Sequence, residues 1–87
     1  MKPEQIYHEL IALAEKFDIT VSEQNFKSTR IKAKSGFCIV KGQKRFIMDK
    51  HLKIHAKIDA LAAYLNQLPH EDVFIVPAIR EVLNRAG

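Results

Sequence analysis

The stretch that decides the fold is GFCIVKGQKRFIM, residues 36–48. Two runs rich in apolar residues flank a Gly-Gln pair at residues 42–43. A glycine at the first position of a two-residue loop provides the positive φ that a type II′ turn requires, and such turns join the strands of a hairpin. We therefore predict a β-hairpin in which Val40 lies opposite Arg45.

The predicted hairpin is apolar on both of its faces, because alternate residues of a strand point to opposite sides of a sheet. A two-layer domain of this size covers one face of its sheet with helices. The second face is then either covered by the last helix or available to a partner. The first face contains Phe37, Ile39, Phe46 and Met48, and the second contains Cys38, Val40, Ile47 and the stem of Arg45.

Before the hairpin, apolar residues recur at steps of three and four, which predicts a helix that starts at Pro3 and runs for about four turns. β-branched residues within residues 19–23 predict a short strand after this helix. Residues 24–35 are polar and rich in Ser and Lys, so we interpret them as a loop that leads into the hairpin.

After the hairpin, the apolar pattern of residues 54–68 predicts the most regular helix, with Asp49 as a candidate cap and Pro69 after its end. Pro77 favours the start of a last helix. The expected fold class is therefore α+β: an N-terminal helix, a small antiparallel sheet of about three strands, and two C-terminal helices. We expect residues 1–87 to form one domain.

Composition agrees with one small folded domain, since 47% of the 87 residues are hydrophobic and 28% are charged. No apolar run approaches the roughly 20 residues of a membrane-spanning helix, so no membrane association is expected. Cys38 is the only cysteine, which excludes an intramolecular disulfide. No leader with a small-residue cleavage site precedes the first predicted helix, so we expect a cytoplasmic location.

The net charge of +4 is concentrated in the middle of the chain. Residues 27–57 carry +9, whereas residues 1–26 carry −3 and residues 58–87 carry −2. A basic hairpin can follow phosphates, so nucleic-acid binding through residues 27–57 is an alternative function. It is not the favoured one, because no aromatic residue is evidently free to stack on bases, and lysines on strands also discourage aggregation. The candidate nucleic-acid contacts are Lys32, Lys34, Lys41, Lys44 and Arg45.

His51, His55 and Asp59 are spaced four residues apart, which would place them on one face of a continuous helix as metal ligands. The spacing of the two histidines matches the HExxH metallopeptidase motif, but Leu52 stands where that motif has its general-base glutamate. We therefore expect no metal and no other cofactor, and keep a metal site at these three residues as an alternative.

No other constellation predicts catalysis. Cys38 is expected opposite Ile47 with no base beside it, so we interpret it as a small hydrophobic residue rather than a nucleophile. Glu71 and Asp72 are adjacent in the sequence just after Pro69, so we interpret them as part of a turn and a helix cap. The sequence has no glycine-rich loop that could bind a phosphate. We expect no catalytic residues and no enzymatic activity.

The succession FDITV, GFCIVKGQKRFIMDKHL and KIDALAAYLNQL resembles the core of the ImmA/IrrE-type zinc metallopeptidases. If residues 61–62 correspond to the start of the LAHELGH helix of that family, Ala63, Tyr64 and Gln67 occupy the positions of the first zinc histidine, the catalytic glutamate and the second zinc histidine. None of the three suits its role, so the resemblance implies a catalytically empty version. Residues 73–81, VFIVPAIRE, also resemble the ending vyvPpalRe of a family of short uncharacterised bacterial proteins.

The leading hypothesis is a bacterial module that works by binding a protein partner or a second copy of itself. Its basis is that the hairpin and the run at residues 73–76 together offer more apolar surface than the predicted helices need to cover. The candidate interaction residues are Cys38, Val40, Ile47, Val73, Phe74 and Ile75.

Overall fold

The computed structural model describes residues 1–25, 36–69 and 72–86. The predicted α+β layout is confirmed, with one helix before the sheet and two helices after it. The greater part of the predicted loop at residues 24–35 lies outside the described residues. In chain order the elements are α1 (Pro3–Lys16), β1 (Ile19–Gln24), β2 (Gly36–Val40), β3 (Gln43–Asp49), α2 (Ile54–Asn66) and α3 (Pro77–Ala86).

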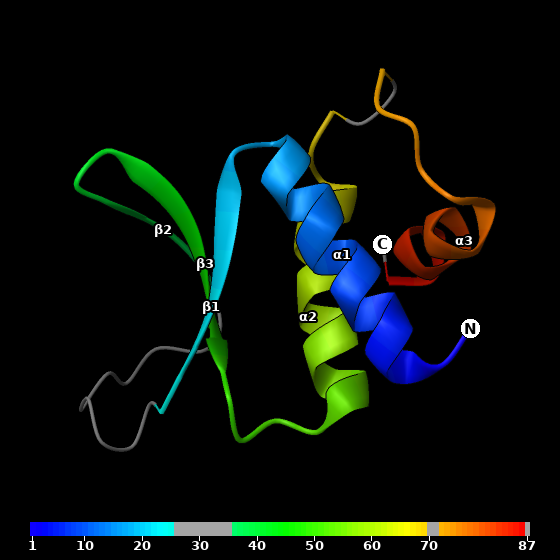
Figure 1. Ribbon diagram of the computed structural model, residues 1–87, viewed down its shortest axis with the longest axis horizontal. Helices are drawn as coiled ribbons and strands as arrows, with labels where there is room; N and C mark the ends of the chain where they lie inside the picture. Colours follow the sequence, from blue (N-terminus) through cyan, green and yellow to red (C-terminus); the bar gives the residue numbers. More distant parts are fainter. Residues whose placement is uncertain (26–35, 70–71, 87) are drawn as a thin grey trace.

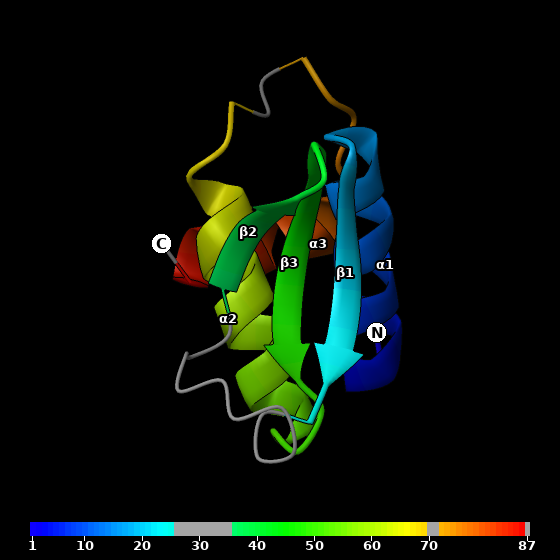
Figure 2. The same ribbon diagram turned by 90° about the vertical axis from the view of Figure 1, so that its left-hand side faces the viewer.

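The three strands form a sheet in the order β1-β3-β2 (Figure 2). β3 is antiparallel to β2 but parallel to β1, so the prediction of an antiparallel sheet is wrong for β1. β3, the second strand of the hairpin, therefore lies between β1 and β2. The central position gives β3 a neighbour on each side, which buries Phe46 and Met48 of this strand.

The hairpin turn lies one residue earlier than the sequence predicts. Residues 41–42 form the loop with φ values of +51° and +80°, and two positive φ values define a type I′ turn. Val40 therefore pairs with Gln43, and Cys38 rather than Val40 lies opposite Arg45. Because this pairing differs from the predicted one by two positions, every side chain keeps its predicted face.

The described helices all lie on one side of the sheet (Figures 1 and 2). α1 packs against β1 and α2, whereas α3 packs mainly against α2 and α1. The last helix therefore forms an outer layer over the other helices and does not cover the second face of the sheet. Figure 1 also shows that the tip of the β2–β3 hairpin projects away from the helices.

The helical patterns of the sequence correspond to the observed core. α2 ends at Asn66, before the Leu68-Pro69 pair, and its buried face matches the predicted repeat. Asp49 does not cap this helix: its Oδ1 accepts the backbone N–H of His51 at 2.9 Å, and the helix begins only after Lys53. The helical residues buried in the core are Tyr7, Leu10, Leu13, Ala14, Ile58, Leu61, Ala62, Leu65, Ile79, Val82 and Leu83.

None of the described helices is both long and apolar enough to span a membrane.

Candidate binding surface

The side of the sheet that faces away from the helices is a mixed apolar and polar surface, which we call the open face. Its members follow from the strand register, because residues that are Cα partners on neighbouring strands point to the same side. Thr20 of β1, Arg45 of β3 and Cys38 of β2 form one row across the sheet. The complete open face consists of Thr20, Ser22, Gln24, Gly36, Cys38, Val40, Gln43, Arg45, Ile47 and Asp49.

The apolar residues that the sequence places on the second face of the hairpin are accessible to different extents. Val40 is 42% exposed, whereas Cys38 and Ile47 are half-buried. No described helix lies over them (Figure 2). The structure thus brings these three predicted interaction residues together on one surface.

β2 is an outer strand of the sheet, and among the described residues it pairs with β3 alone. In a type I′ hairpin the residues next to the turn, here Val40 and Gln43, form a hydrogen-bonded pair, and hydrogen-bonded pairs alternate along an antiparallel ladder. The backbone N–H and C=O groups of Phe37 and Ile39 therefore point away from β3. We call these backbone groups the β2 edge. The Ile39 side chain beside it is 63% exposed.

Aromatic stacking fixes the position of β2 relative to the helices. The Phe37 ring stacks on the Tyr64 ring of α2, with centroids 5.3 Å apart and an interplanar angle of 14°. Tyr64 also contacts Phe46 of β3 at 5.3 Å between centroids. These rings anchor the strand on the helix side, so the Phe37 ring is engaged within the molecule.

The hairpin is positively charged. Lys41 and Lys44 are exposed near its tip, and Arg45 lies in the middle of the open face. Arg45 donates from Nη2 to Gln43 Oε1 at 3.2 Å, but its buried Nε has no acceptor among the described residues. Residues 27–48 contain no Asp or Glu. In space, Glu15 and Asp18 line a depression together with Gly42, Gln43 and Lys44, but among the described residues neither of these acids forms a salt bridge with the hairpin. Lys32 and Lys34, the other candidate phosphate contacts, lie outside the described residues.

The remaining candidate interaction residues lie in the connection between α2 and α3, on the helix side. Ile75 is only 7% exposed and belongs to the core, and Val73 packs against that core. Phe74 is 76% exposed, and its carbonyl oxygen accepts a hydrogen bond from Lys16 Nζ at 3.2 Å. The predicted interaction face is therefore divided: Phe74 offers a separate exposed ring, and Ile75 offers no surface.

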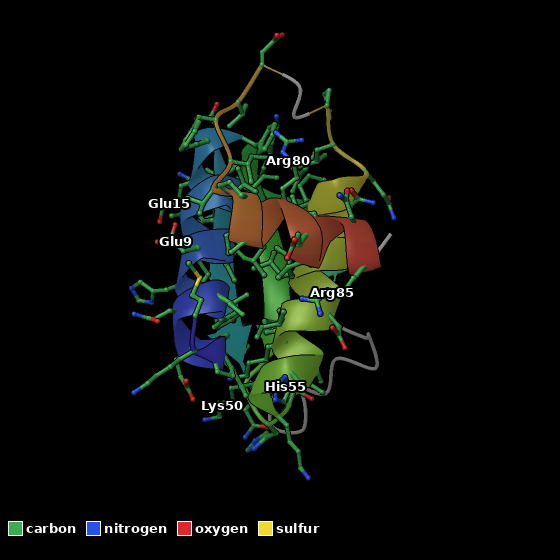
Figure 3. The ribbon with its side chains drawn as sticks, turned by 90° about the vertical axis from the view of Figure 1, so that its right-hand side faces the viewer. Glu9, Glu15, Lys50, His55, Arg80 and Arg85 are labelled. Carbon is green, nitrogen blue, oxygen red and sulfur yellow. The ribbon has the colours of Figure 1, made fainter. Side chains whose placement is uncertain are left out.

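The residues of the alternative metal site do not gather. His51 precedes α2, whereas His55 and Asp59 are on the helix and line a depression of about 290 Å³ together with Arg85 of α3. Figure 3 shows His55 and Arg85 on the helix side of the molecule. Within the described ranges, no group of three or more His, Cys, Asp or Glu residues is placed to hold a metal ion.

The sequence gives no indication of one cluster, which joins α1, β1 and α2. The Tyr7 hydroxyl donates to Glu23 Oε2 at 3.1 Å, and Lys57 Nζ donates to Glu23 Oε1 at 2.7 Å. Lys57 Nζ also lies 5.8 Å from the centroid of the Tyr7 ring. Burial, the negative charge of Glu23 and the hydrogen bond from the Tyr7 hydroxyl to Glu23 raise the pKa of Tyr7 well above its ordinary value. Tyr7 therefore stays protonated as a donor, and the cluster fastens three elements together.

The positions that resemble the metallopeptidase helix lie on α2. Tyr64, at the place of the catalytic glutamate, packs between the rings of Phe37 and Phe46. Its role in this structure is therefore packing. No protein-family model, curated protein or solved structure matches the chain.

Proposed function

We propose that this protein is a binding module that takes a protein partner on the open face and the β2 edge, and that it works without catalysis. The observation that carries the proposal is the placement of all described helices on one side of the sheet. This arrangement leaves Val40 of the outer strand exposed on the open face, and Ile39, on the other face, is exposed near the hairpin tip that projects away from the helices. An unpaired strand edge with exposed apolar side chains is a template for pairing with another chain.

A bacterial, cytoplasmic setting is part of the same proposal. Cys38 is half-buried on the open face, and a reducing compartment would keep it as a thiol. The basic hairpin favours an acidic partner over a basic one. Contact between two copies is a less favoured form of the same activity, because it would bring two basic hairpins together.

Site-specific photo-crosslinking tests this function, since Cys38 is the only cysteine. A benzophenone attached to Cys38 is expected to form an adduct with a defined protein in an extract of the source cells. The control carries the same probe at His8→Cys in a Cys38→Ser background, because His8 is exposed on α1. The captured protein is then identified, purified and titrated.

The titration decides whether the captured protein binds the proposed surface. Val40→Asp is expected to weaken its affinity at least about ten-fold, because a charge would replace the exposed apolar contact that β2 makes beside the turn. The same adducts from the His8 position, no adduct from Cys38, or unchanged affinity of Val40→Asp would overturn the proposed function.

Nucleic-acid binding is a second candidate, and the cluster of Lys41, Lys44 and Arg45 favours it. Against it, the open face has no aromatic side chain among its described residues, so it offers no ring on which bases could stack. If a single-stranded oligonucleotide binds and Lys44→Glu weakens it at least about ten-fold, this second function is supported. Absence of binding at low salt would exclude it.

A further inference from the structure

We infer that the partner segment is an extended, acidic stretch of another protein that joins the sheet as a fourth strand beside β2. This inference rests on the proposed function and specifies the conformation and the charge of what binds. Its three supports are the β2 edge, which is unpaired among the described residues, the exposed aliphatic side chains next to it, and the basic residues Lys41, Lys44 and Arg45 of the hairpin.

The β2 edge offers backbone groups in the spacing of a strand. The N–H and C=O groups of Phe37 and Ile39 point away from β3, as the register from Val40↔Gln43 onward requires. An extended segment can pair with these groups while its side chains alternate between the two faces of the sheet. A helical segment could not, because its own backbone groups are already paired.

The charges around this edge favour acidic side chains in the added strand. On the open face, Arg45 lies directly across from Cys38, so an acidic side chain of the added strand beside Cys38 would be on the same face as the guanidinium. On the opposite face, exposed Lys44 lies directly across from Ile39. Carboxylates are strong acceptors for guanidinium groups.

A second copy of the chain fits this edge less well. Pairing of β2 with β2 of another copy would place Lys41, Lys44 and Arg45 of both copies in one small region, with no acid within residues 27–48 of either chain. Like charges placed close together disfavour association. A nucleic acid also fits less well, because the most exposed apolar groups beside the β2 edge, Ile39 and Val40, are aliphatic and cannot stack on bases as rings do.

The probe for the test is a short synthetic peptide of alternating Glu and Val, added to isotope-labelled protein and followed by amide NMR spectra. We expect saturable shifts that centre on residues 36–45, and slower hydrogen exchange at Phe37 and Ile39 when the peptide is bound. A peptide of alternating Lys and Val is the charge control. An acidic peptide with an N-methyl group on every residue is the backbone control, because it has no N–H on either of its edges to donate to β2.

Two substitutions separate strand pairing from simple apolar contact. Ile39→Pro removes the N–H that points to the edge, and proline is tolerated in an outer strand where its N–H would face solvent. Ile39→Thr is the matched control, since it keeps the N–H and a β-branched side chain. We expect Ile39→Pro to weaken peptide binding at least about ten-fold and Ile39→Thr to weaken it less than about three-fold. Spectra of the free variants verify that both remain folded.

Each outcome decides the inference. Equal binding of the Ile39→Pro and Ile39→Thr variants, or of the N-methylated and unmodified peptides, overturns strand addition. Equal or tighter binding of the basic peptide overturns the acidic partner, and tighter binding of an oligothymidylate indicates nucleic acid instead. Concentration-dependent protection of Phe37 and Ile39 in protein alone indicates a second copy. If Cys38 still crosslinks a protein partner in any of these cases, the proposed function stands and only this inference fails.

Discussion

Individual residues with unusual environments make the most direct predictions about this protein. Tyr7 is buried, and its hydroxyl donates to a Glu23 carboxylate that also pairs with Lys57. Tyr7 and Glu23 are 16 positions apart in the chain, and Glu23 and Lys57 are 34 positions apart, yet their side chains are in contact. The contact stabilises the phenol in its protonated form and holds the end of β1 against two helices.

We expect Tyr7 to ionise at a higher pH in the folded protein than a free tyrosine does. Tyr64→Phe leaves Tyr7 as the only tyrosine, so the ultraviolet absorbance of phenolate then reports Tyr7 alone. We expect little phenolate at the ordinary pKa of 10.0, because burial and the Glu23 charge raise the pKa of Tyr7. Half-ionisation of the folded variant at that pH would contradict the described environment.

Because the pKa of Tyr7 is raised in the folded protein, we expect the free energy of unfolding to fall as the pH becomes alkaline. The folded protein binds the phenol proton more tightly than the unfolded chain does. The contribution of Tyr7 is therefore complete below its ordinary pKa of 10.0 and is lost as the pH rises above that value. In urea titrations, Tyr7→Phe should lose less free energy of unfolding than the parent protein does between neutral pH and pH values above 10.0.

Lys41 is a second residue in an unusual environment, because its φ of +51° is unfavourable for a lysine. Asparagine followed by glycine is the preferred pair in a type I′ turn. We expect Lys41→Asn to raise the free energy of unfolding by about 0.5 to 1 kcal/mol in urea titrations. The matched control, Lys41→Val, removes the same charge but should lower stability, because β-branched residues disfavour positive φ.

This turn also illustrates the limit of prediction from the sequence at the residue scale. Alternation in residues 36–48 correctly predicts which side chains share a face. The same glycine, however, suits the first position of a type II′ turn and the second position of a type I′ turn. Local sequence does not distinguish the two turns, and a choice between them changes the pairing by two positions. The Tyr7–Glu23 contact gives no sequence signal at all, since it depends on the tertiary fold.

At the scale of elements, the helices are well predicted and the sheet is less so. Proline at the start of α1 and of α3, and the apolar repeat of α2, are local signals. The parallel pairing of β1 with β3 depends on how the chain returns between them, which residues 19–23 alone do not determine. The residue type of Asp49 suits a helix cap, but its side chain makes a local turn with His51, and α2 begins at Ile54 after Lys53.

The position of α3 makes a prediction at this scale. Leu83 of α3 has no exposed surface, and Val40 of β2 is 42% exposed. We expect Leu83→Ala to lower the free energy of unfolding by about 2 to 4 kcal/mol. Val40→Ala should lower it by less than about 1 kcal/mol. Urea titrations measure both, and a cost for Val40→Ala as large as that for Leu83→Ala would mean that the open face is covered.

At the scale of the whole molecule, charge is distributed by layer. Glu9 and Glu15 of α1 lie on the helix side, as Figure 3 shows, whereas Lys41, Lys44 and Arg45 lie in the hairpin. Lys57, which belongs to the basic segment of the sequence, is paired with Glu23. The charge of +9 over residues 27–57 is therefore not uniform over the surface. Among the described residues, Lys57 is its only member with a salt bridge, and the hairpin residues Lys41, Lys44 and Arg45 have none.

Salt should weaken the binding of the acidic Glu-Val peptide to this surface. Exposed charges are screened as ionic strength rises, while apolar contact and backbone pairing persist. We expect the affinity in fluorescence anisotropy to fall roughly ten-fold between about 0.05 M and about 0.5 M salt. Lys44→Glu is expected to reduce this dependence. An affinity that is constant or rises with salt would show that the basic residues do not contribute.

The central claim is that β2 presents an unpaired edge, and amide hydrogen exchange of the protein alone tests it most directly. The account predicts alternation along β2: Cys38 and Val40, which pair with β3, should exchange at least about ten-fold more slowly than Phe37 and Ile39. Equal protection of all four amides at low protein concentration would contradict the account, because it would mean that the outer side of β2 is already paired.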